Sequence, residues 1–340
     1  MVTEPTVADA VERLKAGRLV AFPTETVYGL GADVFNEEAV RRVFTVKKRP
    51  MGNPLIVHVA DARMAKRVAA WWPETAERIA AAHWPGPVSM VLPKKERVPA
   101  IVTGGGPNVA VRCPDHPVAL ELLRAFGPLV GPSANVSGEV SPTTAAHVRG
   151  TFLERRVMVL DGGACREGIE STVVALVGTP RVLRPGVVSA AALSEAAGIE
   201  ILPFAGPFAG GAGAAGAVQE GPGMLASHYA PRTPVVLATR GEVEAIAGGG
   251  GRVVVMGTGA AGDAEGSAAG HGFVEMPREA RAYAAGLYAA LRRADEMGAG
   301  RIVVEWPVAG AEGDGAVWEA IGDRLGRASA ERDRDARERR

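Results

Sequence analysis

Residues 6–200 alternate short apolar runs with amphipathic segments, the pattern of a sheet covered by helices. Amphipathic spacing predicts helices over 7–17, 36–48, 61–72, 116–126 and 189–197. Short, mostly apolar runs predict buried strands over 19–22, 55–59, 88–92, 109–112, 129–130, 157–160, 172–176 and 181–183. The first part of the chain is therefore predicted to be an α/β domain with a mixed sheet.

The pattern changes after residue 204. Residues 205–223 are mostly Gly and Ala, too poor in large side chains to form a core, and they predict a flexible linker. Strands follow near 234–238, 252–256 and 301–305, with a helix opened by Pro277, which indicates a small doubly wound domain. We expect domains over 1–204 and 233–327, a linker or lid over 205–232, and a charged, disordered tail over 328–340.

The composition argues against several classes of protein. Hydrophobic residues make up 47% and charged residues 22% of the 340, as in a soluble globular protein. No apolar run approaches the roughly 18 residues of a membrane span, and the acidic N-terminus does not resemble a signal peptide. Lys plus Arg and Asp plus Glu both number 38, which argues against a surface that grips nucleic acid. Cys113 and Cys165 lack metal-ligand spacing, so we expect a cytoplasmic protein with reduced thiols and no protein metal site.

One turn carries an unusual number of polar groups. Phe22-Pro23 ends a strand, and Thr24, Glu25 and Thr26 follow within three positions. We expect Gly29 and Gly31 to let the backbone bend back under whatever these side chains hold. The turn is predicted to be part of a binding site, although a purely structural polar turn would have the same pattern.

A second group lies where a predicted helix ends. Lys47 and Arg49 close the helix, Asn53 follows, and His58 interrupts the next strand. The two cations either compensate the helix dipole or clamp a polyphosphate, for which arginine offers a bidentate fork. His58 is either a satisfied core side chain or a ligand-binding group.

Further hydroxyls and arginines lie at strand ends. Arg112 ends a buried strand, where a guanidinium needs an anion from the protein or from a ligand. Small and polar residues, which permit close approach to a ligand, follow other strands or begin them. They are Ser133 and Asn135 in 131–138, Thr143 (a ligand contact or a helix cap), and Ser171 in 168–173, with Arg184 ending the next strand.

Common catalytic signatures are missing from the sequence. It contains no Walker A loop, dinucleotide fingerprint, zinc spacing or Gly-x-Ser-x-Gly elbow. Catalysis would then depend on positioning and electrostatics.

Nine motifs in order resemble the YrdC-like family, in the long two-domain form of the threonylcarbamoyl-AMP synthases. They are PTETVYGLG at 23–31, Lys47-x-Arg49 with Asn53-Pro-Leu, HWPGP at 83–87, AVRCPDHP at 110–117, GPSANVSG at 131–138, LDGG at 160–163, GIESTV at 168–173, LRPG at 183–186 and PGM…HYAP at 222–231. The resemblance implies a twisted, open α/β domain with a mixed sheet, followed by a smaller Rossmann-like domain.

The resemblance also implies an activity. L-threonine, bicarbonate and ATP, with Mg²⁺, would give threonylcarbamoyl-AMP and pyrophosphate, a nucleotidyltransferase reaction. The product would pass to the transferase machinery that forms threonylcarbamoyladenosine beside the anticodon of tRNA, without stable tRNA binding or a membrane.

Matching motifs assign the site residues. The threonine set is Thr26, His58, Arg112, Ser133 and Ser171, with Arg112 on the substrate carboxylate. Lys47 and Arg49 match catalytic residues. The nucleotide set is Arg49, Asn53, Asn108, Asn135, Thr143, Arg184, His228 and Tyr229, the last two in a lid.

The sequence departs from the family pattern in three places. Asn108 occupies a position where the family usually has threonine. Ala226 occupies the position of a linker tyrosine, and Ala175 that of an aspartate. An RNA-binding or ribosome-maturation module with a basic cavity remains the alternative function, although aromatic residues make up only 5% of the chain. A related carbamoyl transferase would carry zinc-finger and acylphosphatase-like segments that this sequence lacks.

Overall fold

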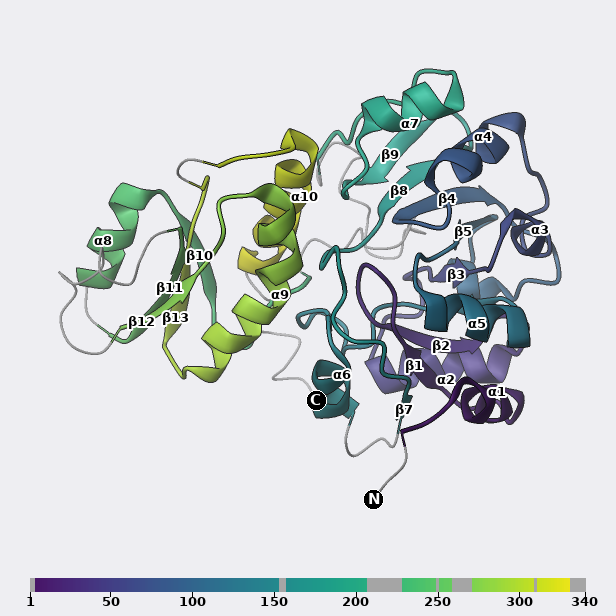
Figure 1. Cartoon of the computed structure of the whole chain (residues 1–340), viewed down its shortest axis with the longest axis horizontal. Coiled ribbons are helices and arrows are strands. Elements are labelled where there is room, and N and C mark those ends of the chain that lie inside the picture. The colour runs from purple at the N-terminus through teal and green to yellow at the C-terminus, as the bar shows by residue number, and fades with distance from the viewer. Residues whose placement is uncertain are drawn as a thin grey trace. The chain divides into compact units, whose positions relative to one another are not determined.

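The chain forms two compact units in the computed structural model (Figure 1). The structure describes residues 4–152, 157–206, 228–248, 251–258, 271–308 and 311–330. Unit 1 comprises residues 1–137 and 141–224, and unit 2 comprises 138–140 and 225–340. Each unit has a sheet of its own and is described separately.

Unit 1 is built on a mixed sheet, as the sequence predicts. The nine strands found in its described part run in the order β7-β1-β2-β6-β3-β5-β4-β8-β9. The pairs β1/β7, β3/β5 and β4/β8 are parallel, and the other neighbours are antiparallel. In chain order the strands are β1 (Val20–Phe22), β2 (Gly29–Asp33), β3 (Ile56–His58), β4 (Val88–Pro93), β5 (Asn108–Arg112), β6 (Leu129–Val130), β7 (Met158–Val159), β8 (Thr172–Ala175) and β9 (Arg181–Arg184).

The helices of unit 1 begin and end at residues with clear local causes. Thr6 and Asp9 form a reciprocal capping box at the first helix, and Asn36 caps the second through the Ala39 N–H. Ser189 caps the last helix in the same way. The helical elements are α1 (Val7–Lys15), α2 (Glu37–Lys47), α3 (Ala62–Ala65), α4 (Glu74–His83), the short 3₁₀ turn η1 (Ala100–Thr103), α5 (Pro117–Phe126), α6 (Ala145–Phe152) and α7 (Ala190–Ala197).

The predicted helix over 61–72 is wrong beyond its first turn. It ends at Ala65 because the following backbone pairs with the end of β4 instead. Ala70 N–H donates to the Pro93 carbonyl, and Lys95 N–H donates to the Val68 carbonyl. Tertiary hydrogen bonding here outweighs the helical spacing of the apolar residues.

The glycines of the polar turn have a different role from the one predicted. Gly29 and Gly31 do not bend the backbone; they belong to β2 and lie opposite Phe22 and Val20 of β1. A Cβ at residue 29 would lie 2.9 Å from Phe22 Cζ, and one at residue 31 would lie 3.1 Å from Phe22 Cε1. The missing side chains therefore leave space for the Phe22 ring.

The two faces of this sheet are covered unequally. One face packs on α2, α4 and α7 and forms the main hydrophobic core. The other face is covered near β1 and β6 by α1 and α5, which pack with Phe22 and Leu129. Over β3, β5, β4, β8 and β9 that second face carries a small apolar cluster: Ile56, Val91, Ala110, Val173, Ala175 and Leu183. We call this second face the site face.

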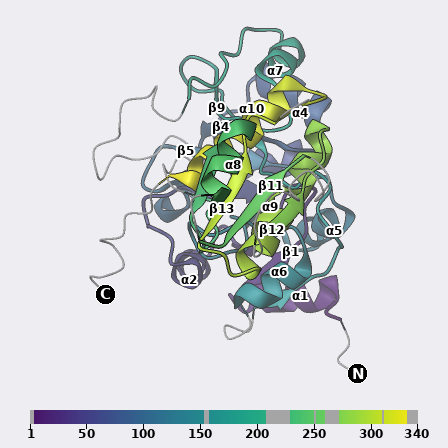
Figure 2. The same ribbon diagram turned by 90° about the vertical axis from the view of Figure 1, so that its left-hand side faces the viewer.

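Unit 2 is a doubly wound parallel sheet, as predicted. Its strand order is β10-β13-β11-β12, and all three pairings are parallel. Figures 1 and 2 show α8 on one face of the sheet and α9 with α10 on the other. The elements are β10 (Val235–Ala238), α8 (Arg240–Gly248), β11 (Val253–Gly257), β12 (Gly272–Glu275), α9 (Ala280–Glu296), β13 (Arg301–Glu305) and α10 (Gly315–Ser329).

Several sequence predictions fall on residues outside the described ranges. The predicted linker over 205–232 lies largely in 207–227, and 331–340 of the predicted tail are also outside. The start of that tail, 328–329, is the end of α10 and is helical, because Ala328 packs into the core. The strand predicted near 252–256 is β11, and β12, which begins at Gly272, was not predicted.

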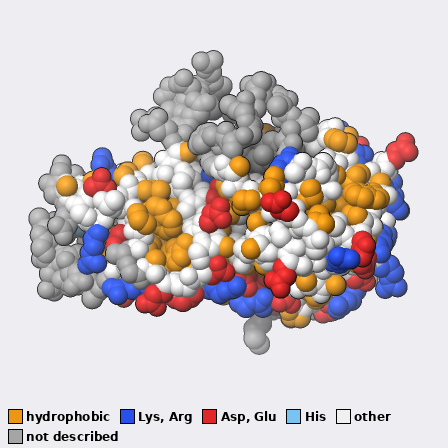
Figure 3. Space-filling view, turned by 90° about the horizontal axis from the view of Figure 1, so that it is seen from above, with side chains coloured by type: hydrophobic (Ala, Val, Ile, Leu, Met, Phe, Trp, Pro, Cys, Tyr) orange, Lys and Arg blue, Asp and Glu red, His pale blue; other side chains and the backbone are white. Residues whose placement is uncertain are grey.

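The charge distribution agrees with the neutral composition. On the face seen in Figure 3, Lys and Arg side chains are mixed with Asp and Glu. The part of this face that grey atoms do not cover has no extended basic area. None of the helices in the described ranges is long and apolar enough to cross a membrane.

Gly186 gives a test of how tightly the sheet edge packs. A Cβ at residue 186 would lie 2.7 Å from Thr172 Oγ1 and 2.8 Å from the Ser171 carbonyl carbon. We expect Gly186→Ala to lower the free energy of unfolding by about 1–3 kcal/mol. Gly150→Ala, in an exposed turn of α6 with open space around it, should instead raise it by about 0.5–1 kcal/mol. Urea unfolding followed by circular dichroism measures both, and equal effects would contradict the packing.

Candidate functional site

Polar side chains gather on the site face because of strand periodicity. Side chains two residues apart share a face, so His58 follows Ile56 and Arg112 follows Ala110 at the edge of the small apolar cluster. Ser89 and Ser171 stand in the same relation to Val91 and Val173. Strand register then places His58 directly beside Arg112, and Ser89 one position from the start of β8. One polar row therefore borders the apolar cluster.

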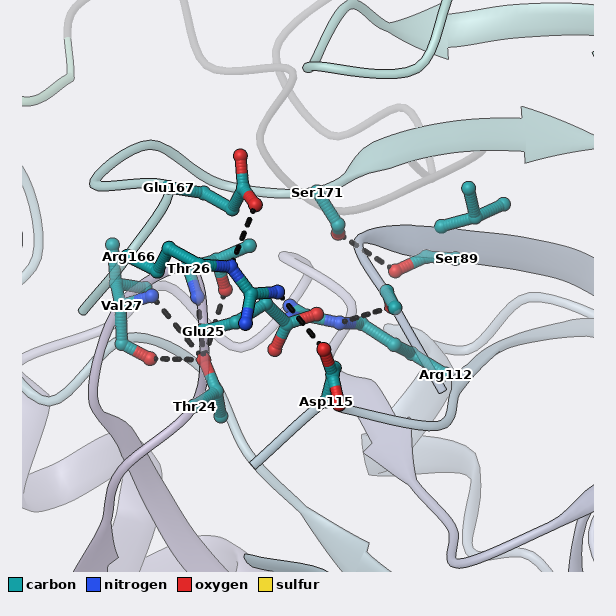
Figure 4. A network of polar contacts seen from close by, with 12 residues as sticks. Thr24, Glu25, Thr26, Val27, Ser89, Arg112, Asp115, Arg166, Glu167 and Ser171 are labelled. Atoms are coloured by element: carbon teal, nitrogen blue, oxygen red, sulfur yellow. Dashed lines mark hydrogen bonds and ion pairs between the residues drawn. The ribbon is translucent and has the colours of Figure 1, made fainter. Parts of the chain in front are cut away.

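The polar turn 23–28 brings a carboxylate to this row. Glu25 Oε2 lies 2.6 Å from Arg112 Nη2, and the two side chains are 1% and 4% exposed. Figure 4 shows Glu25 and Arg112 pointing toward each other. The anion required by the buried guanidinium is thus a protein carboxylate in this structure, one of the two possibilities left open by the sequence.

Thr24 shapes the turn that holds Glu25. Its hydroxyl donates to the Val27 carbonyl at 2.7 Å and accepts from the N–H groups of Thr26 and Val27. Thr24 Oγ1 also lies 2.9 Å from Thr26 Oγ1. Either hydroxyl can be the donor of that bond, and in both cases Thr26 Oγ1 keeps an acceptor lone pair.

The turn is also tied to two other loops. Tyr28 N–H donates to the Pro142 carbonyl, and Glu167 N–H donates to the Glu25 carbonyl at 2.7 Å. The Tyr28 hydroxyl donates to the Gly163 carbonyl and accepts from Gly162 N–H. Thr24, Glu25 and Tyr28 therefore order the turn, as expected for a preorganised site.

Ser171 and Arg184 form a second contact group at the same end of the sheet. Ser171 Oγ lies 2.8 Å from Ser89 Oγ, and both hydroxyls are buried. Arg184 donates through Nε and Nη2 to the Ser171 carbonyl and through Nη2 to Ser171 Oγ. Arg184, predicted in the nucleotide set, thus lies among residues predicted for the amino acid.

His58 is neutral in the folded protein. Burial lowers its pKa well below the usual value, and the charge on Arg112 lowers it further, while a backbone hydrogen bond opposes the shift. Its ring meets Phe22 edge to face at 5.4 Å. Only glycine fits beside it at residue 131, where a Cβ would lie 2.6 Å from His58 Nδ1. That nitrogen accepts no hydrogen bond from the described residues.

Lys47 joins α2 to the loop 131–138. Its ammonium donates to the carbonyls of Ser133 and Asn135, the latter at 2.5 Å, and the side chain is 1% exposed. The Ser137 N–H returns a bond to the Lys47 carbonyl. An isolated β-bridge between Gly29 and Ser133 places this loop beside the polar turn. Ser133 and Asn135 are therefore held through their backbones.

Arg49, Asn53 and Asn108 lie toward the other end of β3 and β5. Arg49 donates to the Asn53 carbonyl, to Asn53 Oδ1 at 2.6 Å and to the Pro54 carbonyl. Asn108 begins β5, four residues before Arg112, which in a strand is about 13 Å. The structure does not bring Asn108 together with Arg112.

Two further predicted residues have local partners. Thr143 Oγ1 lies 3.4 Å from His147 Nδ1. Its neighbour Thr144 accepts the His147 N–H in the first turn of α6, so the capping role belongs to Thr144. Nearby Ser141 donates to Glu170 Oε1 at 2.7 Å, and both are buried.

His228 and Tyr229 belong to unit 2. Their rings meet at 4.1 Å, and Tyr229 stacks on Tyr288 of α9. Tyr229 has a positive φ of 63°, which is rare for a tyrosine, and both side chains are buried. The predicted tyrosine position at Ala226 lies outside the described residues.

Sequence reasoning missed two members of the polar row. Glu25 was in none of the predicted site sets, yet it is the partner of Arg112. Ser89 was not singled out, although a hydroxyl in the apolar run 88–92 was a visible signal. Of the predicted amino-acid set, His58, Arg112 and Ser171 lie in this row, and Thr26 lies in the turn that carries Glu25.

The described residues contain no group of three or more His, Cys, Asp or Glu side chains that could hold a metal ion. Both cysteines are free and buried, and burial raises the pKa of each thiol to about 12. Neither thiol is therefore a ready nucleophile or metal ligand at neutral pH.

Two family models match the chain. Residues 12–186 match the Sua5/YciO/YrdC model, described as telomere recombination. Residues 188–330 match the model of the threonylcarbamoyl-AMP synthase C-terminal domain. Together they cover both units.

Curated relatives carry the same name. A threonylcarbamoyl-AMP synthase of Pyrococcus abyssi is 44% identical over 227 residues, 66% of this chain and 65% of that protein. The Bacillus subtilis threonylcarbamoyl-AMP synthase is 39% identical over 239 residues, 69% of this chain and 67% of that protein. These alignments thus span about two thirds of the relatives' length.

A solved structure matches both units. The crystal structure of P. abyssi Sua5 complexed with L-threonine superposes with a TM-score of 0.85 at 38% identity. The match covers 95% of this chain and 94% of that one.

The lowered pKa of His58 predicts how stability depends on pH. An unfolded histidine takes up a proton near pH 6.5, whereas the buried His58 does not. The contribution of the neutral His58 to the free energy of unfolding is therefore fully present above about pH 6.5 and decreases as the pH falls below that value. We expect the urea midpoint to drop between pH 7.5 and pH 5.5, and to drop less in His58→Gln. An equal drop of the urea midpoint in both proteins would show that groups other than His58 cause the loss of stability at low pH.

Proposed function

Because residues 12–186 match its model, the chain belongs to the Sua5/YciO/YrdC family, and we propose that it is an L-threonylcarbamoyladenylate synthase. It condenses L-threonine, bicarbonate and ATP to threonylcarbamoyl-AMP and pyrophosphate. In that reaction the threonine amine becomes a carbamate, and the carbamate attacks the α-phosphate of ATP. This makes the enzyme a nucleotidyltransferase.

The observation that carries the proposal is the setting of Arg112. Its guanidinium is buried beside hydroxyls and a neutral histidine, and no contact of the described residues uses its Nη1. A buried guanidinium that pairs with Glu25 through Nη2 and has a further donor group suits a small carboxylate ligand. The Sua5 structure that superposes on this chain is named as a complex with L-threonine.

We assign the amino-acid site on that basis. Arg112 binds the threonine carboxylate, and Thr26 and Ser171 contact the ligand through hydroxyls. His58 contributes as a neutral ring, because its lowered pKa excludes a charge at neutral pH. Ser133 completes the set predicted from the family motifs.

The proposed nucleotide site has two kinds of member. Arg49 and Lys47 supply positive charge for phosphates, and Asn53, Asn108, Asn135 and Thr143 supply neutral polar groups. Because Lys47 and Arg49 already donate to carbonyl and amide oxygens, they also shape the loops that would carry ATP. Arg184, His228 and Tyr229 stay in this set on the family resemblance.

The remaining parts of the proposal concern partners. Mg²⁺ would arrive with the phosphates of ATP, since the described side chains offer no clustered ligands for it. The product would pass to the tRNA threonylcarbamoyl transferase machinery in the cytoplasm. The RNA-binding alternative gains no support, because the net charge is zero and the visible surface mixes both signs.

An omission assay tests the activity. We expect pyrophosphate release from ATP only when threonine and bicarbonate are both present, with threonylcarbamoyl-AMP as the product by mass spectrometry. Release that ignores either substrate would reject the proposal. Steeply salt-dependent RNA binding without ATP cleavage would favour the alternative.

Thr26→Val tests the amino-acid site without changing side-chain shape. The substitution removes one hydroxyl, whose hydrogen bond to the described residues is with Thr24. Losing one ligand hydrogen bond costs about 1–1.5 kcal/mol, so the KM for threonine should rise about tenfold with the KM for ATP unchanged. Thr179→Val, in an exposed turn between β8 and β9, is the matched control. Equal KM values in wild type and Thr26→Val would remove Thr26 from the site.

A further inference from the structure

Glu25 is a buried carboxylate with unused hydrogen-bonding capacity. It is 2% exposed, and neither of its oxygens accepts a hydrogen bond from the described residues. Its ion pair with Arg112 is close, but the Arg112 Nη2 group is not aligned to donate to it. A buried carboxylate accepts several hydrogen bonds when its site is complete. Glu25 is therefore incomplete without a donor from outside the described residues.

The neighbours of Glu25 indicate the kind of donor. Thr26 follows Glu25 directly in the turn, and its hydroxyl keeps an acceptor lone pair whichever of Thr24 and Thr26 donates in their shared bond. Two adjacent acceptor groups, one of them charged, suit a cationic donor with several protons. Beside them lies Arg112, whose Nη1 is available to an anion.

We propose that Glu25 is the specificity residue for the substrate's α-ammonium group. The Glu25–Arg112 pair then recognises an α-amino acid as a zwitterion, with Arg112 on the carboxylate and Glu25, aided by Thr26, on the ammonium. Each charge of the ligand replaces part of the contact that the two side chains make with each other. The inference rests on the proposed function, in which that nitrogen is the atom to be carbamoylated.

This role differs from a merely structural one. If Glu25 only oriented Arg112, its loss would weaken every carboxylate ligand alike. If it binds the ammonium, its loss weakens only ligands that carry one. The second outcome can be measured with two ligands that share a carboxylate and differ in one group.

The experiment compares L-threonine with (2S,3R)-2,3-dihydroxybutanoate, in which a hydroxyl replaces the ammonium. Calorimetric titration of wild-type protein should show at least about 100-fold tighter binding of threonine, since a buried charged acceptor left without its cation is costly. In Glu25→Gln threonine binding should weaken about 100-fold, while binding of the hydroxy acid changes less than about threefold. Glu25→Asp keeps the charge and should keep part of the preference for threonine.

Asp115→Asn is the matched control. Asp115 is a carboxylate that pairs with the exposed Arg166 near the same loops, at 2.9 Å, and makes no ion pair with Arg112. Its substitution should leave both affinities within about threefold. Circular dichroism checks that each variant is folded.

Three results would overturn the inference. Equal weakening of both ligands in Glu25→Gln would assign Glu25 a positioning role only. If the wild-type protein binds threonine less than about tenfold more tightly than the hydroxy acid, Glu25 also has a positioning role only. This measurement needs no variant, so the inference can be tested even if Glu25→Gln does not fold. Normal pyrophosphate release together with either result would overturn this inference and leave the proposed function standing, whereas wild-type protein that binds no threonine would overturn both.

Discussion

The ion pair between Glu25 and Arg112 is the contact on which the rest of the site depends. Removing two charges from water costs several kcal/mol per ion, and the fold meets that cost with one close pairing rather than a full hydrogen-bond network. Backbone hydrogen bonds join the polar turn to two other loops, and they hold Glu25 in its buried position. A site prepared in this way exchanges one set of buried contacts for another when a charged ligand arrives.

Much of the fold could be predicted from the sequence. Strands such as 109–112 and 301–305 were found because apolar runs of that length have few alternatives. The helix over 61–72 failed because backbone partners at Pro93 and Lys95 are distant in sequence. The strand β2 was missed because glycines carry no hydrophobic signal, and their packing against Phe22 is visible only in three dimensions.

The site was predictable to a lesser degree. Motifs singled out Thr26, His58, Arg112 and Ser171. Strand register places His58 beside Arg112, and a hydroxyl contact joins Ser171 to Ser89, whereas Thr26 lies in the polar turn next to Glu25. The sequence could not tell whether the anion beside Arg112 would be a ligand or Glu25, because pairing across 87 positions of chain depends on how a turn folds over the sheet. Arg184 was placed with the nucleotide because it matches a family motif, and its contact with Ser171, which comes from the β8–β9 pairing, was not visible in the sequence. The assignments of individual residues to threonine or ATP stay predictions.

The Phe22 ring, lying over two glycines of the neighbouring strand, links three positions of the sequence. A larger residue at 29 or 31 has no room while an aromatic ring occupies position 22, and a smaller residue at 22 would leave a void against His58. A substitution at any one of the three positions therefore disturbs the packing at the other two, even where it would look conservative by itself. The strand β2, which follows the polar turn, thus depends on the Phe22 ring for its position, and so does the turn.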